Sequence, residues 1–272
     1  MLLPITSADP LIDIGANLTH ESFNSDLEAV LNRAREANVS HMVVTGSDIK
    51  ESISAIKLAS CHPDVLSATA GIHPHYASQF NQEAEQQLQD LLNKPEVCAI
   101  GETGLDFFRD ISPREQQQES FIAHLELAAA SGKPLFLHQR NAHDAFVALL
   151  KEYRHKLGNV VVHCFTDTRE ALHDYLDLEC HIGITGWICD ERRGKALYDC
   201  VGDIPLRKLM IETDCPYLMP RNIKPKPKTR RNEPCMLPMV LQTVTSARLE
   251  TQAQIAAATT ENALEFFELR PN

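Results

Sequence analysis

A chain of 272 residues, 43% hydrophobic and 23% charged, has the composition of an ordinary globular protein with a large core. It carries no run of about 20 apolar residues, the length that a membrane helix needs, so we predict no membrane association. The formal net charge of −11 argues against unspecific binding of a polyanion over the whole surface. The first ten residues include Asp9 and no basic residue, which argues against a secretory signal and predicts a cytoplasmic protein.

Short apolar runs alternate with amphipathic stretches along the whole chain. The predicted strands are, in chain order, Leu11–Ala16, His41–Thr45, Leu66–Ala70, Val97–Gly101, Pro134–His138, Asn159–His163, His181–Thr185 and Lys208–Thr213. The predicted helices between and after them include Ser22–Ala37, Ser47–Ser60, Pro113–Ser131, Ala142–Glu152, Thr168–Leu178 and closing helices within Pro234–Phe267. Buried strands separated by helices are typical of a parallel sheet covered by helices. Eight such units in this length predict a single (β/α)8 TIM-type barrel domain over residues 1–272.

Two local patterns add detail to this prediction. In Ser112–Glu115 a serine, a proline and a glutamate have the spacing of a capping box, which predicts Ser112 as the N-cap of the following helix. The eight cysteines show no CxxC spacing, and several lie inside apolar runs. Buried free thiols in a reducing compartment explain these cysteines better than disulfides or a structural zinc site.

Polar side chains recur at the carboxyl ends of the predicted strands. The residues at these positions are His73 and His75 after the third strand, Glu102 and Asp106 after the fourth, His138 and His163 on the fifth and sixth, and Glu212 and Asp214 on the eighth. In a parallel barrel the strand ends meet at one rim, where the active sites of this fold lie. A single histidine at a strand end is more often a satisfied polar residue than a ligand. Two histidines on adjacent strands, with carboxylates on two others, favour a metal site.

We therefore predict that Glu102, His138, His163 and Asp214 bind a divalent metal ion. Glu212 is expected to be either a partner of the metal-binding residues or a residue of the barrel interior, because successive residues of a strand point to opposite sides.

The net negative charge requires a local basic patch if the substrate is a polyanion. From Arg221 to Arg231 the chain carries six basic residues and no acidic one: Arg221, Lys224, Lys226, Lys228, Arg230 and Arg231. A solvated loop kept open by prolines explains this segment equally well on charge alone. Trp187 is a candidate for stacking on a nucleobase or for the core, and Arg140 for a phosphate clamp or a loop salt bridge.

Several of these motifs, found together and in order, resemble the signatures of the TatD family of metal-dependent DNases. The motifs are Gly71–His75 (GIHPH), Gly101–Asp106 (GETGLD), Val162–Thr166 (VHCFT) and Glu212–Leu218 (ETDCPYL). The resemblance runs from about Asp13 to Phe267, nearly the whole chain. Two further blocks, Gly183–Gly194 and Lys226–Pro234, resemble the protein that gives the family its name more than its paralogues.

The resemblance implies a monomer-sized cytoplasmic barrel of the amidohydrolase superfamily. It implies a magnesium-dependent 3′ to 5′ exonuclease acting on single-stranded DNA or RNA, with a role in DNA repair. By motif, Glu102, His138 and His163 match the metal-binding positions, and Asp214 matches the catalytic acid.

One departure from the wider family lies after the first strand. Many members have Asp-x-His-x-His there, whereas this chain has Gly15 and Asn17 at the two histidine positions. Glycine has no side chain to coordinate with, and the Asn17 amide oxygen is a weak donor. The first metal site of the family should therefore be weak, empty or tuned to Mg²⁺ with several retained waters.

The resulting hypothesis is a phosphodiester hydrolase with Mg²⁺ as the expected ion and Mn²⁺ or Zn²⁺ as alternatives. Asp214 would orient or deprotonate the attacking water, and His73 would contact the scissile phosphate or help a second ion. One rival keeps the barrel and metal but hydrolyses an amide or ester, for instance as an aminoacyl-tRNA deacylase. A rival of another class is a non-catalytic nucleic-acid-binding protein, suggested by the lost histidines and opposed by the four retained candidate ligands.

Overall fold

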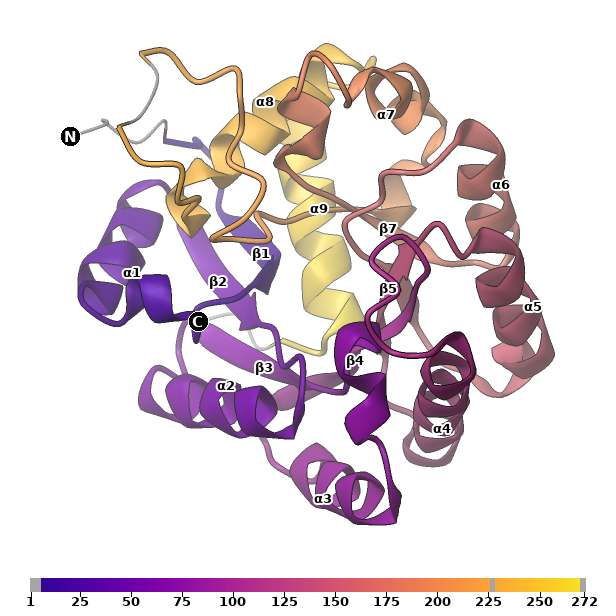
Figure 1. Ribbon diagram of the computed structural model, residues 1–272. Coiled ribbons are helices and arrows are strands. Elements are labelled where there is room, and N and C mark those ends of the chain that lie inside the picture. Colours follow the sequence, from indigo (N-terminus) through magenta and orange to yellow (C-terminus); the bar gives the residue numbers. More distant parts are fainter. Residues whose placement is uncertain (1–5, 226–227, 270–272) are drawn as a thin grey trace. The chain divides into compact units, whose positions relative to one another are not determined.

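The computed structural model describes residues 6–225 and 228–269 and contains eight parallel strands in chain order (Figure 1). The strands are β1 (Leu11–Ala16), β2 (Val39–Val44), β3 (Leu66–Ala70), β4 (Val97–Asp106), β5 (Leu135–Arg140), β6 (Val160–Val162), β7 (His181–Ile184) and β8 (Leu209–Ile211). A parallel bridge between Ala16 and Cys215 joins β1 to the segment that follows β8. This arrangement confirms the predicted (β/α)8 barrel fold.

The helices of the described residues follow the strands in the expected alternation. They are α1 (Leu27–Glu36), α2 (Ile49–Cys61), α3 (Gln82–Leu92), α4 (Arg114–Ser131), α5 (His143–Tyr153), α6 (Arg169–Asp177), α7 (Lys195–Cys200), α8 (Leu237–Ser246) and α9 (Gln252–Phe266). Within residues 6–225 and 228–269, none combines the length and the apolar character needed to cross a bilayer.

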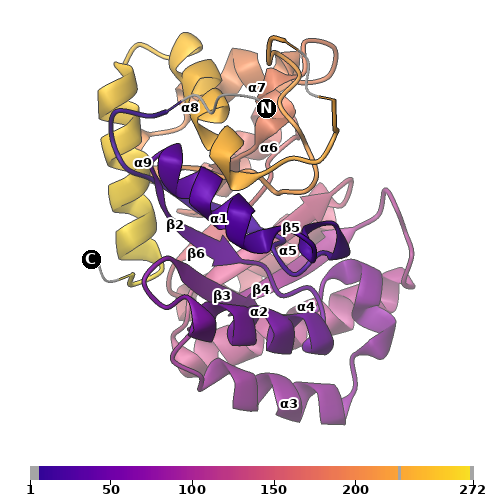
Figure 2. The same ribbon diagram turned by 90° about the vertical axis from the view of Figure 1, so that its left-hand side faces the viewer.

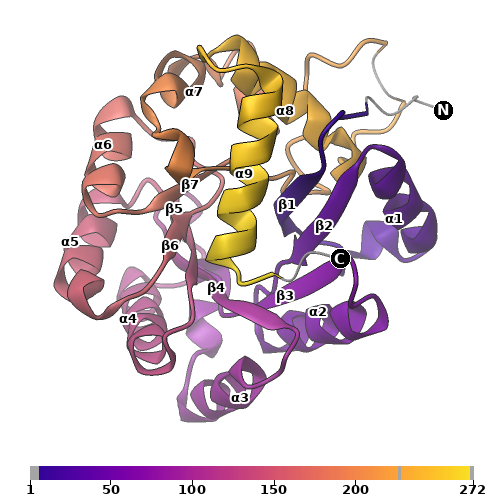
Figure 3. The same ribbon diagram turned by 180° about the vertical axis from the view of Figure 1, so that it is seen from behind.

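The chain divides into two compact units, which we describe in turn. The first unit comprises residues 6–44, 164–169, 182–225 and 228–269, with strands β1, β2 and β8 and nearly all of β7. In this unit α9 packs against β1 and β8, and Figure 3 shows it beside β1. Helix α1 packs against β2. A capping box starts α9, since Thr251 accepts from the Gln254 amide and the Gln254 side chain bonds back to Thr251.

The second unit comprises residues 45–163 and 170–181 and contains β3 to β6. Helix α2 packs against β3 and α3 (Figure 2), and α4 packs against β4. Between α4 and α5, the rings of Phe121 and Phe146 stack with centroids 5.1 Å apart. Both rings are fully buried, so this apolar contact holds α4 and α5 together.

Strand β4 is longer than predicted. Its glycines explain why the strand continues and why the sequence suggests an earlier end. The sequence predicts an end at Gly101, but β4 continues to Asp106 and pairs Gly104 with His138 and Asp106 with Arg140 of β5. Gly104 has a φ of +139°, and a Cβ there would lie 1.9 Å from the His138 carbonyl oxygen. Glycine, which usually ends a strand, here allows two backbones to approach closely.

Gly104→Ala should therefore destabilise the fold far more than Gly132→Ala. Gly132 also has a positive φ of +73°, but a Cβ there meets nothing within 4 Å. We expect a loss of about 1 kcal/mol for Gly132→Ala, from backbone strain alone. For Gly104→Ala we expect more than about 3 kcal/mol, because the clash adds to the strain. Urea unfolding of both variants measures the difference, and equal losses would contradict the close approach of β4 and β5.

All eight cysteines are free thiols, as predicted. Five are buried, and Cys61 at the end of α2 is exposed. Burial raises the pKa of Cys98 to about 12 and that of Cys189 to about 11, so both remain protonated near neutral pH.

Candidate active site

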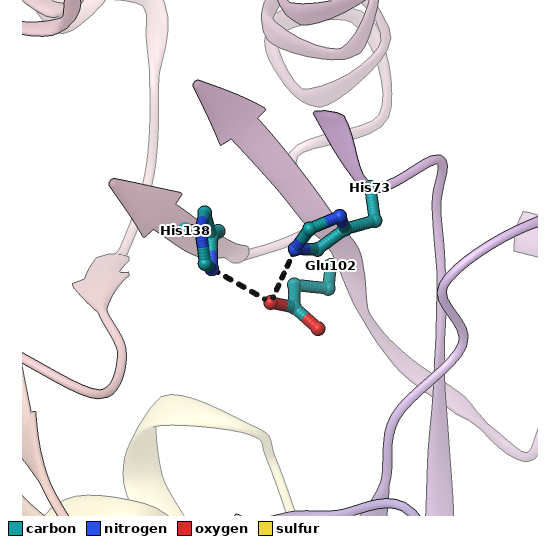
Figure 4. Close-up of side chains that lie close together, drawn as sticks. All are labelled: His73, Glu102 and His138. Carbon is teal, nitrogen blue, oxygen red and sulfur yellow. Dashed lines mark ion pairs between the residues drawn. The ribbon is translucent and has the colours of Figure 1, made fainter. Parts of the chain in front are cut away.

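Three imidazoles of the second unit converge on one carboxylate oxygen. Glu102 Oε1 lies 2.8 Å from His163 Nε2, 3.0 Å from His138 Nδ1 and 3.3 Å from His73 Nε2. Figure 4 shows His73, from the loop after β3, and His138, from β5, approaching the same oxygen. Glu102, His73 and His163 are each less than 10% exposed, so the cluster is largely shielded from water.

The strands of the second unit explain this convergence. Glu102 lies on β4 and His138 on β5, while His163 follows β6 directly. His73 follows β3 and is held by its own amide, which donates to the Ser47 carbonyl at 2.8 Å. The preceding Ile72 amide donates to Nε2 of the fully buried His124 at 3.0 Å. Of the predicted site residues, the structure therefore brings together His73, Glu102, His138 and His163.

Asp106 and His75 extend the cluster, and the prediction from the sequence includes no role for them. Asp106 Oδ2 accepts from His138 Nε2 at 3.2 Å and from His75 Nε2 at 3.0 Å. Burial would raise the pKa of Asp106, but the hydrogen bonds from His138 and His75 outweigh it and hold the pKa far below its usual range. The spacing could have revealed Asp106, because residues 102 and 106 lie on the same face of one strand.

The loop that carries His75 corrects one sequence prediction. Helix α4 begins at Arg114 without a side-chain cap, so the capping box with Ser112 as N-cap is wrong. Instead the Ser112 hydroxyl donates to the His75 carbonyl at 2.9 Å and accepts from the Ser78 amide at 3.2 Å. The serine thus connects the loop after β3 to the loop after β4. Its partner His75 lies too far along the chain for a local motif to indicate this contact.

The proton positions distinguish His73 from the other imidazoles. His73 Nδ1 accepts from the His75 amide at 3.0 Å, so the ring proton belongs on Nε2, which faces Glu102. Burial lowers the pKa of His73 to about 4, outweighing the attraction of Glu102, and the ring is neutral near pH 7. A neutral imidazole whose N–H points into the site is a hydrogen-bond donor rather than a metal ligand.

His138 lies between two carboxylates, Glu102 at Nδ1 and Asp106 at Nε2. Burial would lower its pKa, but the hydrogen bonds to Asp106 and Glu102 outweigh burial and raise it. The two flanking carboxylates therefore stabilise a positive charge at His138. A metal ion at Nδ1 would meet the same demand, with Asp106 holding the proton on Nε2 in the usual carboxylate–histidine–metal arrangement.

The donor geometry fits a divalent ion. His73, Glu102 and His138 each place one nitrogen or carboxylate oxygen within 4.8 Å of the others, and His163 reaches the same Glu102 oxygen. With His73 as a hydrogen-bond donor, Glu102, His138 and His163 are the ligand candidates. Neighbouring ligands at right angles around an ion with bonds of about 2.1 Å lie about 3.0 Å apart. The distances from Glu102 Oε1 to His163 Nε2, 2.8 Å, and to His138 Nδ1, 3.0 Å, match this separation. Imidazole favours zinc-like ions and carboxylate favours Mg²⁺ or Mn²⁺, so the donor set does not select one.

Asp214 belongs to the first unit and follows β8 with a φ of +52°. Its amide donates to the Gly15 carbonyl at 2.9 Å, and its Oδ1 accepts from Asn17 Nδ2 at 3.0 Å. The two residues that replace the expected histidines therefore position Asp214. Aspartate is one of the few residues other than glycine that tolerate this backbone region.

Asp13 anchors the residue before Asp214. It is fully buried, and its Oδ1 accepts from the Thr213 amide at 2.9 Å. Burial raises the pKa of Asp13 to about 7, even though the hydrogen bonds from Thr213 oppose the shift. Glu212 is also fully buried and accepts from the Cys164 amide.

The comparison with known proteins decides the family. A model of the family described as TatD related DNase matches residues 12–268. The chain belongs to the TatD related DNases. It is 47% identical over 259 residues to the 3′-5′ ssDNA/RNA exonuclease TatD of Edwardsiella piscicida, covering 95% of this chain and all of that relative.

Solved structures agree with this membership. YJJV, a TatD homologue from Escherichia coli K12, is 29% identical with a TM-score of 0.87 and covers 96% of this chain and 98% of its own. An uncharacterised amidohydrolase from Saccharomyces cerevisiae shares the fold at 24% identity and a TM-score of 0.86, covering 95% and 99% of the two chains. The predicted family and the predicted fold are confirmed.

In this TatD related DNase, two of the predicted substrate-binding residues stack with a neighbouring side chain. The guanidinium of Arg140 lies 3.9 Å from the centroid of the Phe108 ring, and that of Arg193 lies 4.3 Å from the Trp187 ring. Trp187 is half-buried in the short helix Gly186–Cys189 after β7. The alternative of a loop salt bridge for Arg140 is not found, since Arg140 forms no ion pair within residues 6–225 and 228–269.

The basic segment of the DNase is heterogeneous. Arg231 donates to Asp26 and Glu233 at 2.8 Å, and these hydrogen bonds raise its pKa despite partial burial. Arg221 pairs with Glu191 at 3.3 Å. Lys224, Lys228 and Arg230 are exposed, and Lys226 lies outside the described residues. Arg231 and Arg221 thus already have anionic partners.

Proposed function

We propose that this protein is a Mg²⁺-dependent exonuclease that removes nucleotides from the 3′ end of single-stranded DNA or RNA. The observation that carries the proposal is the convergence of His73, His138 and His163 on Glu102 in a member of a DNase family. The relatives named as 3′-5′ ssDNA/RNA exonucleases support the substrate and the direction of degradation. Free, buried cysteines support a reducing, cytoplasmic setting, and we further propose a monomer that serves in DNA repair.

Glu102, His138 and His163 are the residues that we assign to the metal. A bound divalent ion would lower the pKa of a coordinated water and neutralise charge on the phosphate. Asp106 and Glu102 fix the ring of His138 between them, which prepares it for binding without a change of rotamer. His73 has its Nε2 proton directed into the cluster and is suited to donate to a phosphoryl oxygen, which extends the phosphate contact that the sequence suggested.

Asp214 is assigned the role of general base. It follows β8 at the carboxyl end, where the active sites of parallel barrels lie. Asn17 donates to Oδ1 at 3.0 Å and so orients the carboxylate that would accept a proton from water. In this reading Asn17 positions Asp214 instead of binding a first metal ion.

A metal titration on end-labelled oligonucleotides tests the proposal. We expect shortening of single strands from a free 3′ end, loss of activity with EDTA and recovery with Mg²⁺ or Mn²⁺. A 3′-blocked oligonucleotide should survive where a 5′-blocked one is degraded. Cleavage of aminoacyl-tRNA with no action on either oligonucleotide would identify an ester hydrolase instead, and binding of oligonucleotides without turnover would identify a non-catalytic binding protein.

The exposed residues of the basic segment should bind the substrate backbone. For Lys228→Ala with Arg230→Ala, the log–log salt slope for binding a single strand should fall by about 1.4, since each lost phosphate contact removes about 0.7. The matched control, Lys57→Ala with Lys151→Ala, removes the same charge from exposed positions on α2 and α5. Fluorescence anisotropy at several salt concentrations measures both slopes, and equal changes in the two variants would remove this segment from the binding surface.

A further inference from the structure

An exposed phenylalanine stands beside the histidine cluster. Phe108 is 54% exposed, although it lies only two residues beyond the buried Asp106. Its backbone is nevertheless held firmly, because Asp106 Oδ1 accepts from the Phe108 amide at 3.0 Å and from the Arg109 amide at 2.8 Å. The ring is thus fixed at its base, open to solvent and attached to the carboxylate that bonds the histidines, where an aromatic face is able to stack on a bound ligand.

Arg140 covers this ring. Its guanidinium carbon lies 3.9 Å from the ring centroid, and its carbonyl accepts from the Phe107 amide at 2.9 Å. The loop after β4 and the end of β5 are thus joined by both backbone and side chain. Because Arg140 has no ion pair within residues 6–225 and 228–269, its charge and its N–H groups are available to a ligand.

A single carboxylate links this pair to the reaction centre. Asp106 Oδ2 bonds His75 and His138, while its Oδ1 bonds the loop that carries Phe108. In the β4–β5 register, Asp106 lies opposite Arg140, and Gly104 lies opposite His138. Arg140 is therefore two residues beyond His138 on β5, and Phe108 is two residues beyond the end of β4 at Asp106.

We propose that Phe108 and Arg140 form a stacking platform for a nucleobase of the substrate, next to the phosphodiester that is cleaved. Aromatic rings and guanidinium planes are the surfaces on which single-stranded nucleic acids stack their bases without sequence preference. The free edge of the guanidinium contacts the adjoining phosphate. This inference rests on the proposed function and assigns to Phe108 and Arg140 a substrate-positioning role.

The platform is tested by combining a substitution of Phe108 with the removal of one base from the substrate, and by measuring kcat/KM for each combination. The probes are single-stranded oligonucleotides that carry an abasic nucleotide at one of the last three 3′ positions, compared with the intact oligonucleotide. For the unaltered enzyme, kcat/KM should fall about 10-fold when the stacked base is missing. Phe108→Leu keeps the apolar bulk but removes the ring. It should degrade the intact oligonucleotide at the reduced rate and show no further loss with the abasic one.

Ile111→Ala is the matched control. Ile111 is 62% exposed in the same loop, so its removal changes the apolar surface without touching the platform, and the abasic penalty should persist. Phe108→Tyr should also retain the penalty. If Phe108→Leu keeps the full abasic penalty, the platform is refuted while the nuclease stands. If the unaltered enzyme degrades no single strand at all, the proposed function fails and the platform fails with it.

Discussion

Replacing Glu102 by glutamine is expected to abolish nuclease activity and to release the metal ion. The amide keeps the size of the side chain but removes the charge on which His73, His138 and His163 converge. Losing one partner of a buried charged group costs about 3–5 kcal/mol. If that loss falls on the transition state, turnover drops by a factor on the order of 1000.

Two measurements on purified Glu102→Gln check this expectation. Degradation of an end-labelled single strand should be absent, and calorimetric titration with Mn²⁺ should show no tight site. Glu119→Gln is the matched control, because Glu119 lies exposed on α4 in the same unit. Near-normal turnover in Glu102→Gln would remove the carboxylate from the site. Loss of activity in Glu119→Gln would show that the assay responds to general damage.

Asp214→Asn is expected to lower kcat by about 100- to 10,000-fold while leaving metal affinity largely intact. General-base groups contribute rate enhancements of this size. Asparagine, like aspartate, tolerates the positive φ of this position, so the backbone should keep its conformation. The substitution removes the proton acceptor and little else.

The decisive measurement is metal binding in the same variant. Retained Mn²⁺ binding with slow turnover supports the role of Asp214 as a base. Loss of the bound ion would instead make Asp214 a ligand. The exposed Asp177 on α6 offers the control, and Asp177→Asn should change neither quantity.

The barrel and the centre of its site were predictable because both depend on local patterns. Apolar runs predict the strands, and three of the four cluster residues are predicted as ligands because polar side chains follow at the ends of those runs. His138 and His163 needed only the rule that parallel strands meet at one rim.

Other features depended on partners far along the chain. The extension of β4 to Asp106 depends on how closely β5 approaches its glycines, which no local pattern reveals. The hydroxyl of Ser112 can cap a helix or bond a distant backbone group. In the structure it bonds the His75 carbonyl and does not cap α4. The sequence places Arg231 in a basic segment, but in the structure it pairs with Asp26, 205 residues away.

The distribution of the thiols makes this protein convenient for spectroscopy. A maleimide dye should react first at Cys61, because the thiolate is the reactive form and most of the other thiols are buried. Cys61 closes α2, a helix of 13 residues whose first turn follows the Ser47 carbonyl that holds His73. The attachment point of the dye at Cys61 would therefore lie about 18 Å along the helix axis from the start of α2 at Ile49. Energy transfer from this position to a fluorophore on an oligonucleotide end would follow the arrival and shortening of a strand without introducing any new cysteine.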